Sequence, residues 1–375
     1  MVVIIILKQY NGGKRMEGNN SEFREYNESQ EEKTGGCKCC GSLMIEEGYN
    51  YDLCESCRDK LSKRPIPKKF LLIAIGIIAI LIISLMKFPS YLDEGISFKK
   101  ATKAIKEGNY ITAMNYYEKL LDNGFDSYKN KIELAELYYY NDYVSDAYYI
   151  YDSLAGVSMD KVLVNKAERI MDKIEKYYIY GDELYYAVEE LEDESDDALL
   201  ELIKPYVDSD PSEVCGASTL IDIYIDKSMF EEAKALAEKV VSENQDYYYG
   251  KYQLASIYIE LGEYDNCSSI IDEMFDFNKE SIYAYISKSK IELKKGNNEQ
   301  GLIFAEEACD LDPYNTEALM NLALAYHYND MTEERDSIYD YCVENELILE
   351  SDSDYYKSIF LGDYNWQDGD GGENI

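Results

Sequence analysis

A spacing of 34 residues recurs through most of this sequence and constrains the fold more than any other feature. Gly108 and Asp142 are one interval apart, and a second series runs in three equal steps through Ser228, Gly262, Gly296 and Asp330. Each position falls in a polar turn between two amphipathic stretches. One such pair of stretches cannot bury its apolar face alone, so the pairs have to stack on one another.

Small residues recur at fixed distances from these turns. The positions seven before each turn are Ala101, Ala135, Ile221, Ala255, Ser289 and Ala323, and those five after are Ala113, Ala147, Ala233, Cys267, Gly301 and Arg335. Small side chains let two helices cross closely, and larger apolar residues three or four apart form a stripe that packs against the next pair. The pattern predicts an all-α chain of stacked helical hairpins.

These hairpins resemble the tetratricopeptide repeat. The clearest copy covers residues 284–314, where the matching positions are Gly296, Gly301, Ala305, Ala308 and Pro313. The resemblance covers about six units between Asp93 and Asn345 and implies a right-handed α-solenoid, in a repeat domain that spans residues 93–361. The sequence departs from the repeat motif at Arg335, where a charged residue replaces a small one, and this suggests a looser final hairpin.

Residues 156–213 break the period. We expect helices there at 161–178, 182–191 and 196–206, which separate two regular blocks.

An uncharged apolar run, FLLIAIGIIAILIISLM, occupies residues 70–86. As a helix it measures about 26 Å at ~1.5 Å per residue, close to the ~30 Å thickness of a bilayer core. A buried core helix is the alternative reading, but such a uniform apolar surface favours a single membrane span. More basic residues precede the run than directly follow it, so the positive-inside rule predicts a cytoplasmic N-terminus and an extracellular repeat domain.

Charge divides the chain in the same place. Up to Ser90 there are 13 Lys and Arg against 11 Asp and Glu, and from Tyr91 onward 24 against 63, within a total net charge of −37. So acidic a repeat domain repels phosphates, which excludes nucleic acid as its partner. The single His327 also leaves little room for imidazole chemistry, and we expect no enzyme and no small-molecule substrate.

Four cysteines before the apolar run have the spacing C-x2-C-x13-C-x2-C. They are Cys37, Cys40, Cys54 and Cys57. Two such pairs can place four thiolates around one zinc ion, and the stretch resembles a zinc ribbon. Its zinc is expected to be structural, because four protein ligands leave no open position; Cys39 is a competing ligand, and a disulfide-bonded loop is the alternative. The basic link that follows suits anionic lipid headgroups or, alternatively, nucleic acid.

The predicted organisation follows from these features. In order, it comprises a disordered N-terminus (1–35), a zinc-ribbon-like knuckle (36–58), a basic linker (59–69), a transmembrane helix (70–88), the repeat domain (93–361, irregular at 156–213) and a disordered acidic tail (362–375). The codons that can encode residues 12–16 resemble a ribosome-binding site before a start codon, so we expect translation to begin at Met16, with a genuine N-terminal extension as the alternative.

Tetratricopeptide arrays usually bind proteins, and the resemblance implies a groove lined by the first helix of each hairpin. The groove candidates are Glu136, Tyr139, Tyr140, Asp222, Asp226, Tyr249, Tyr252, Tyr283, Lys290, Lys294, His327 and Tyr328. Tyr with Asp and Lys suits an extended peptide, although each Tyr can equally be a packing residue.

Three functions remain open at this stage: a membrane-anchored scaffold for a protein or peptide partner, a sensor that relays an envelope signal to the zinc ribbon, and a cell-wall glycan-binding or carboxylate-pair hydrolytic protein. The layout resembles a recurring design in bacterial Gram-positive envelope proteins, which favours the first two.

Overall fold

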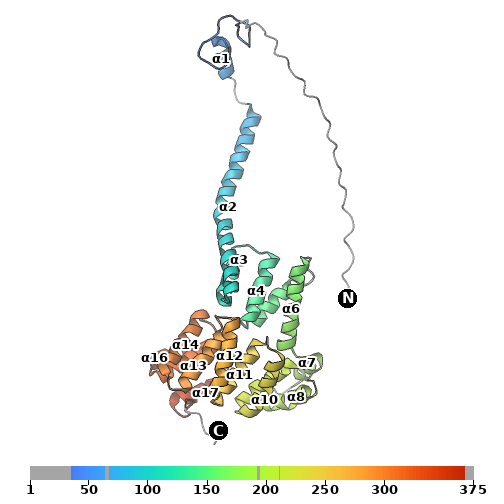
Figure 1. Cartoon of the computed structure of the whole chain (residues 1–375), viewed down its shortest axis with the longest axis vertical. Helices are drawn as coiled ribbons and strands as arrows, with labels where there is room; N and C mark the ends of the chain where they lie inside the picture. Colours follow the sequence, from blue (N-terminus) through green and yellow to red (C-terminus); the bar gives the residue numbers. More distant parts are fainter. Residues whose placement is uncertain (1–34, 64–66, 192–194, 211, 368–375) are drawn as a thin grey trace. The chain divides into compact units, whose positions relative to one another are not determined.

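The computed structural model describes residues 35–63, 67–191, 195–210 and 212–367, and across these ranges it holds helices α1 to α17 and no strand (Figure 1). The chain divides into two units, residues 1–83 and 84–375. The predicted disordered N-terminus and the Met16 start concern residues 1–34, which lie outside the described residues.

The first unit contains the cysteine knuckle, α1 (Glu55–Ser62) and the beginning of α2 (Lys68–Glu107). Apolar side chains of α2 are exposed along residues 70–86, from 52% at Ile82 to 75% at Met86. No residue of its most apolar stretch is buried in the structure. By length and composition, α2 can cross a membrane.

The second unit is built from the end of α2 and fifteen further helices. They are α3 (Tyr110–Asp122), α4 (Tyr128–Tyr140), α5 (Val144–Ser153), α6 (Lys161–Tyr178), α7 (Asp182–Glu189), α8 (Asp196–Ser209), α9 (Val214–Asp226), α10 (Phe230–Glu243), α11 (Tyr248–Glu260), α12 (Tyr264–Phe277), α13 (Ile282–Lys294), α14 (Asn298–Leu311), α15 (Thr316–Tyr328), α16 (Thr332–Glu344) and α17 (Glu350–Leu361).

The 34-residue period marks the turns between paired helices. All six predicted turn residues have a positive φ, between 56° and 78°. Glycine adopts this conformation without strain, and Asp tolerates it better than most residues. The positions seven residues before the turns are fully buried without exception, so small side chains do lie where the paired helices cross.

Gly301 shows how tight these crossings are. A Cβ atom there would lie 2.7 Å from Leu293 side-chain atoms and 3.2 Å from the Ser289 carbonyl oxygen. The predicted helical-hairpin repeat is therefore confirmed.

Helices α6, α7 and α8 join the two regular blocks. The first block runs from the end of α2 to α5, and the second from α9 to α16. The bounds of α6 are those expected from the sequence, whereas α7 ends two residues earlier and α8 ends three residues later than expected. Helix α6 contacts α4 of the first block and α9 of the second, so the irregular stretch is the joint between them.

The joint brings the first block back against the second, so that residues far apart in the sequence touch. The Lys279 amide donates to the Gly108 carbonyl at 2.8 Å, and the Thr112 hydroxyl donates to Glu280 at 2.6 Å. Tyr143 donates to Asp312. A simple solenoid has contacts between neighbouring repeats only, so this closure is a feature that the repeat pattern did not predict.

The end of the described chain also differs from expectation. The sequence placed residues 362–375 in a disordered tail, but Trp366 is only 3% exposed and packs against the array. The prediction is wrong for residues 363–367, because the single Trp of the chain has an apolar surface worth burying. Residues 368–375 lie outside the described part.

Candidate functional site

One helix from each pair contributes to a continuous row. Successive contacts run from α4 to α6, α9, α11, α13 and α15, and we call this row the inner face. The groove candidates all lie on it: Glu136, Tyr139 and Tyr140 on α4, Asp222 and Asp226 on α9, Tyr249 and Tyr252 on α11, Tyr283, Lys290 and Lys294 on α13, and His327 and Tyr328 on α15. The structure separates most of them into a central group and a C-terminal group, and His327 and Asp226 lie outside both.

The central group gathers around Asp142, at the turn after α4. Its carboxylate accepts hydrogen bonds from the hydroxyls of Tyr178 at 2.6 Å and Tyr283 at 2.7 Å. Burial raises the pKa of Asp142 to about 6, although both tyrosines lower it. Burial first, and then Asp142, raises the pKa of each tyrosine well above 10, so both hydroxyls stay protonated donors.

Further tyrosines and carboxylates form the same kind of hydrogen bond along α11. Tyr252 stacks on Tyr283 with the ring centroids 4.3 Å apart, and its hydroxyl donates to Glu317 of α15. Asp222 accepts from Gln253 at 2.7 Å, and burial raises its pKa to about 7. We call Asp142, Tyr178, Asp222, Tyr249, Tyr252 and Tyr283 the central cluster.

The central cluster leaves almost no space. The cavity beside it, lined by Tyr139, Asp142 and Tyr283 among others, has a volume of about 20 Å³. That is room for one water molecule and not for a peptide side chain. The cluster therefore fills the middle of the inner face and joins the two blocks.

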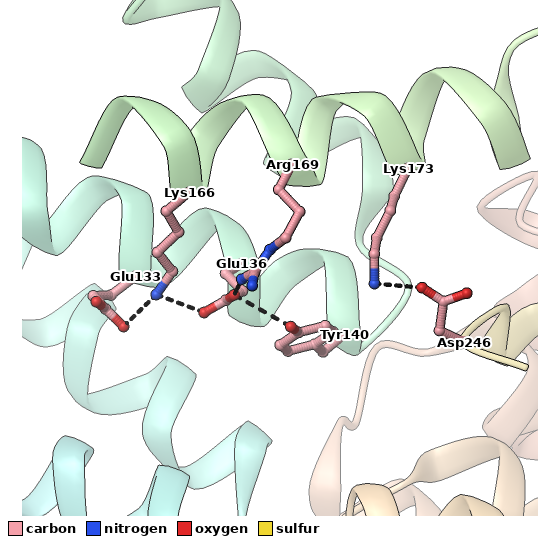
Figure 2. Close-up of polar contacts among 7 residues, drawn as sticks. All are labelled: Glu133, Glu136, Tyr140, Lys166, Arg169, Lys173 and Asp246. Carbon is pink, nitrogen blue, oxygen red and sulfur yellow. Dashed lines mark hydrogen bonds and ion pairs between the residues drawn. The ribbon is translucent and has the colours of Figure 1, made fainter. Parts of the chain in front are cut away.

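Charged residues of α6 hold the joint in place beside this cluster. Figure 2 shows Lys166 between Glu133 and Glu136 of α4, at 2.9 and 2.6 Å, with Arg169 also 2.9 Å from Glu136. Farther along α6, Lys173 pairs with Asp246, which precedes α11, at 2.5 Å. One helix thus forms ion pairs with both blocks.

The C-terminal group contacts the chain's own tail. Lys294 lies 3.0 Å from Glu260, and its ammonium donates to the main-chain carbonyl of Trp366 at 2.5 Å. The indole N–H of Trp366 donates to Glu260 at 3.0 Å, and the Tyr328 hydroxyl accepts from the Gln367 amide at 3.0 Å. We call Glu260, Lys294, Asn298 and Tyr328 the tail site.

His327 and Asp226 lie apart from these two groups. The His327 ring is 5.4 Å from that of Phe360 in α17 and hydrogen-bonds Arg335 at 3.2 Å. Burial and then Arg335 lower its pKa. Asp226 lies at the end of α9, where partial burial, followed by the charges of Asp196 and Asp352, raises its pKa to about 6.

Sequence reasoning missed Asp142, Tyr178, Glu260 and Trp366 as inner-face residues. A signal existed for Asp142, since an Asp stands at a turn position where three of the six turns have Gly. No repeat position marks Trp366, because the tail lies outside the repeats.

The cysteine knuckle brings its four expected ligands together. The sulfur atoms of Cys37, Cys40, Cys54 and Cys57 all lie within 4.8 Å of one another. The Cys40 and Cys54 sulfurs are 3.5 Å apart. Tetrahedral zinc with bonds of about 2.3 Å needs sulfurs about 3.8 Å apart, so the donor set fits zinc.

Local structure explains this convergence. Gly41 has a φ of 75°, and its amide donates to the Cys37 carbonyl at 2.8 Å, which forms the turn between the first two cysteines. Cys54 precedes α1 and Cys57 lies in its first turn, where hydrogen bonds with neighbouring thiols, Cys40 first, raise the pKa of Cys57. Backbone hydrogen bonds, the strongest at Cys54, lower the pKa of Cys37 to about 6. Residues 35–63 contain no strand, so a β-ribbon is not seen there.

Comparison with known proteins finds similarity in structure only. No family model matches the chain, and no curated protein does. Among solved structures, MamA is 18% identical and covers 45% of this chain and 96% of its own, with a TM-score of 0.33. YrrB, "a TPR protein with an unusual peptide-binding site", is 14% identical over 58% and 94%, with a TM-score of 0.27.

Yeast Tom70 is 13% identical over 73% of this chain and 67% of its own, with a TM-score of 0.32. At such identities and scores, these structures do not bear on function. The helical-repeat architecture follows instead from the turns and crossings of this chain.

Proposed function

We propose that this protein is a membrane-anchored, non-catalytic scaffold that binds an extended protein segment on its inner face. The observation that carries the proposal is the tail site, where α11, α13 and α15 hold residues 366–367 through contacts to main-chain atoms as well as side chains. Recognition of the main chain is what an extended peptide requires.

Position-specific photocrosslinking in intact cells tests this function. A photoreactive residue at Tyr328, on the inner face, is compared with one at Tyr149, which is 75% exposed on α5. We expect a discrete protein adduct from position 328 and none from 149. The same adducts from both positions, or adducts with wall polymer only, would exclude the scaffold.

The interior carboxylates argue against the hydrolytic alternative. Asp142 and Asp222 have raised pKa values, as an acid catalyst often has. Both, however, are bonded to Tyr or Gln side chains, and the cavity beside Asp142 has no room for a sugar. Their arrangement supports a structural role.

For the knuckle, we propose a structural zinc ion held by Cys37, Cys40, Cys54 and Cys57. Arg58 supports the loop between the pairs through an ion pair with Glu46 at 2.7 Å and a bond to the Tyr51 carbonyl at 3.0 Å. Metal analysis of the purified chain should find one zinc per molecule, and Cys54→Ser should lose it. Zinc retained by Cys54→Ser, or absent from the wild type, would contradict this site.

For topology, we propose one span with a cytoplasmic N-terminus and an extracellular array. The basic residues at 58–69 and the acidic surface beyond residue 90 support it. Protease added to intact cells should digest the array and leave residues 35–63 protected. The reverse pattern would place the array in the cytosol.

A further inference from the structure

We propose that the tail site recognises a partner peptide with a Trp followed by a carboxamide side chain, and that residues 363–367 are an internal occupant that this peptide displaces. The proposal rests on the scaffold function and specifies its ligand. Its basis is the number of directed contacts made to two consecutive tail residues.

The indole of Trp366 is recognised on its edge and on its face. Glu260 uses one carboxylate oxygen for the indole N–H at 3.0 Å and the other for Lys294 at 3.0 Å. The Lys294 ammonium lies 4.1 Å from the centre of the Trp366 ring system, a cation–π distance. A Phe side chain would leave the Glu260 oxygen without its donor, so the site favours Trp.

The main chain and the next side chain are recognised as well. Lys294 binds the Trp366 carbonyl, and Tyr328 accepts from the Gln367 amide. The Gln367 carboxamide donates to Asn298 at 2.8 Å and to the Leu293 carbonyl at the end of α13. A peptide in the same position therefore favours a side chain after its Trp that can donate two hydrogen bonds, as an amide does.

With the tail docked, the key cation of the site is almost fully enclosed. The Lys294 side chain is 4% exposed and the Glu260 side chain 21% exposed. Burial of an ion pair is costly unless its remaining hydrogen-bonding capacity is used. In this structure, only the tail supplies the indole and carbonyl that use it, so an empty site would favour another ligand of the same chemistry.

The occupant is attached in a way that permits exchange. Helix α17 ends at Gly362, whose φ of 77° turns the chain away from the helix axis. Asp363 and Asn365 are exposed, and Trp366 is the one side chain of residues 363–367 classed as buried. Release of a terminal segment leaves the contacts between repeats unchanged.

The chain has one Trp, so 5-fluorotryptophan labels position 366 alone and its ¹⁹F resonance reports the tail. The probe is a blocked synthetic peptide, Asp-Tyr-Asn-Trp-Gln, added to the full-length chain in detergent. We expect the resonance to move to the position of an exposed indole as the peptide is added. The same peptide with Ala in place of Trp should have no effect.

Peptide affinity gives a second readout. A tethered tail competes at an effective concentration of about 1 mM, so Trp366→Ala should bind a dye-labelled peptide at least tenfold more tightly than wild type. Lys294→Met in that background should abolish binding, whereas the neighbouring Lys295→Met, matched for charge, should not. Should Lys294→Met fail to fold, Glu260→Gln serves instead, with at least tenfold weaker binding.

Equal binding by wild type and a folded Trp366→Ala would overturn the inference, and so would no binding by Trp366→Ala. Peptide binding without any protein crosslinked from position 328 would leave the tail site intact and remove the scaffold function. If a protein is crosslinked from position 328 but the ¹⁹F resonance does not move, the scaffold function is retained and the displacement of the tail is excluded.

Discussion

The middle and the C-terminal end of the inner face are both occupied, but by different parts of the chain. In the middle, the central cluster joins two folded blocks through tyrosines that donate to buried carboxylates, as Tyr178 and Tyr283 do to Asp142. At the C-terminal end, Lys294 and Glu260 hold a short segment that ends the described chain.

This difference shows which part of a helical array is free to bind. Opening the middle would separate two blocks and expose the stacked rings of Tyr252 and Tyr283. Opening the C-terminal end requires only that residues 363–367 leave. We therefore expect substitutions in the central cluster to lower the free energy of unfolding strongly, and substitutions at the tail to lower it little. For peptide binding we expect the reverse order.

The largest effect should come from Tyr252→Ala. Tyr252 is 5% exposed, stacks on Tyr283 and donates to Glu317. Loss of a buried aromatic ring should lower the free energy of unfolding by about 4 kcal/mol, measured by denaturant titration of the full-length chain. Tyr341→Ala, at a residue that is 43% exposed, is the control and should cost less than about 1 kcal/mol. Similar losses in the two variants would show that the central cluster is not a core.

Asp142 should make stability depend on pH. Its pKa rises from 3.8 in the unfolded chain to about 6 when folded, so the folded state binds the proton more tightly. The stability that Asp142 contributes is fully present below pH 3.8 and is lost as pH rises through 6. Relative to Asp142→Asn, wild type should therefore lose roughly 3 kcal/mol between pH 4 and 7. A constant difference would contradict burial of this carboxylate.

Asp246 is a carboxylate whose pKa shifts in the opposite direction to that of Asp142. Burial raises its pKa, but the bonds from Lys173 and Tyr177 outweigh burial and leave it lowered. Its contribution is therefore present above pH 3.8 and lost as pH falls. Relative to Asp246→Asn, wild type should gain stability as pH rises through 4, and a trend in the direction seen for Asp142 would contradict the ion pair with α6.

A smaller effect is expected from the joint. Glu136→Gln removes the ion pairs of Glu136 with Lys166 and Arg169, which are partly shielded from solvent, so we expect a loss of about 1–2 kcal/mol that shrinks in high salt. Lys204→Gln breaks an exposed pair within α8 and should cost about 0.3 kcal/mol. Equal effects would mean that the joint is held mainly by apolar contacts.

The smallest effect on global stability should come from Trp366→Ala, in spite of the size of the side chain. Because the tail can detach locally, its contacts contribute only the free energy of docking, and we expect less than about 1 kcal/mol. A loss near that of Tyr252→Ala would make the tail part of the core and remove the distinction between the two ends.

The repeat pattern predicted much of this fold because turn conformation and helix crossings depend on residues close together in the sequence. Gly296 and Asp330 lie at turns of positive φ, and Ala255 and Ser289 lie at crossings, as their spacing requires. The cysteine spacing likewise brought four sulfur atoms together. These features depend on neighbours within about one repeat, so a single sequence carries them.

Closure and tail docking could not be predicted, because they depend on contacts across the array. The bond from Thr112 to Glu280 spans 168 residues, and neither residue occupies a repeat position. Trp366 follows a stretch typical of disorder, Glu260 occupies no position that the repeat pattern marks, and Lys294 was expected to face a partner in the groove and not the chain's own tail. The path through α6 brings Thr112 and Glu280 together, whereas the tail site depends on the return of the chain after α17 to α11 and α13.

Quenching of Trp366 fluorescence in the wild-type chain tests the central claim most directly. Since the chain has one Trp, its emission reports the tail site without interference. We predict blue-shifted emission and several-fold slower quenching by acrylamide than for a free indole, with both differences lost in Lys294→Met and kept in Lys295→Met. Emission and quenching typical of an exposed indole in the wild type would contradict the account.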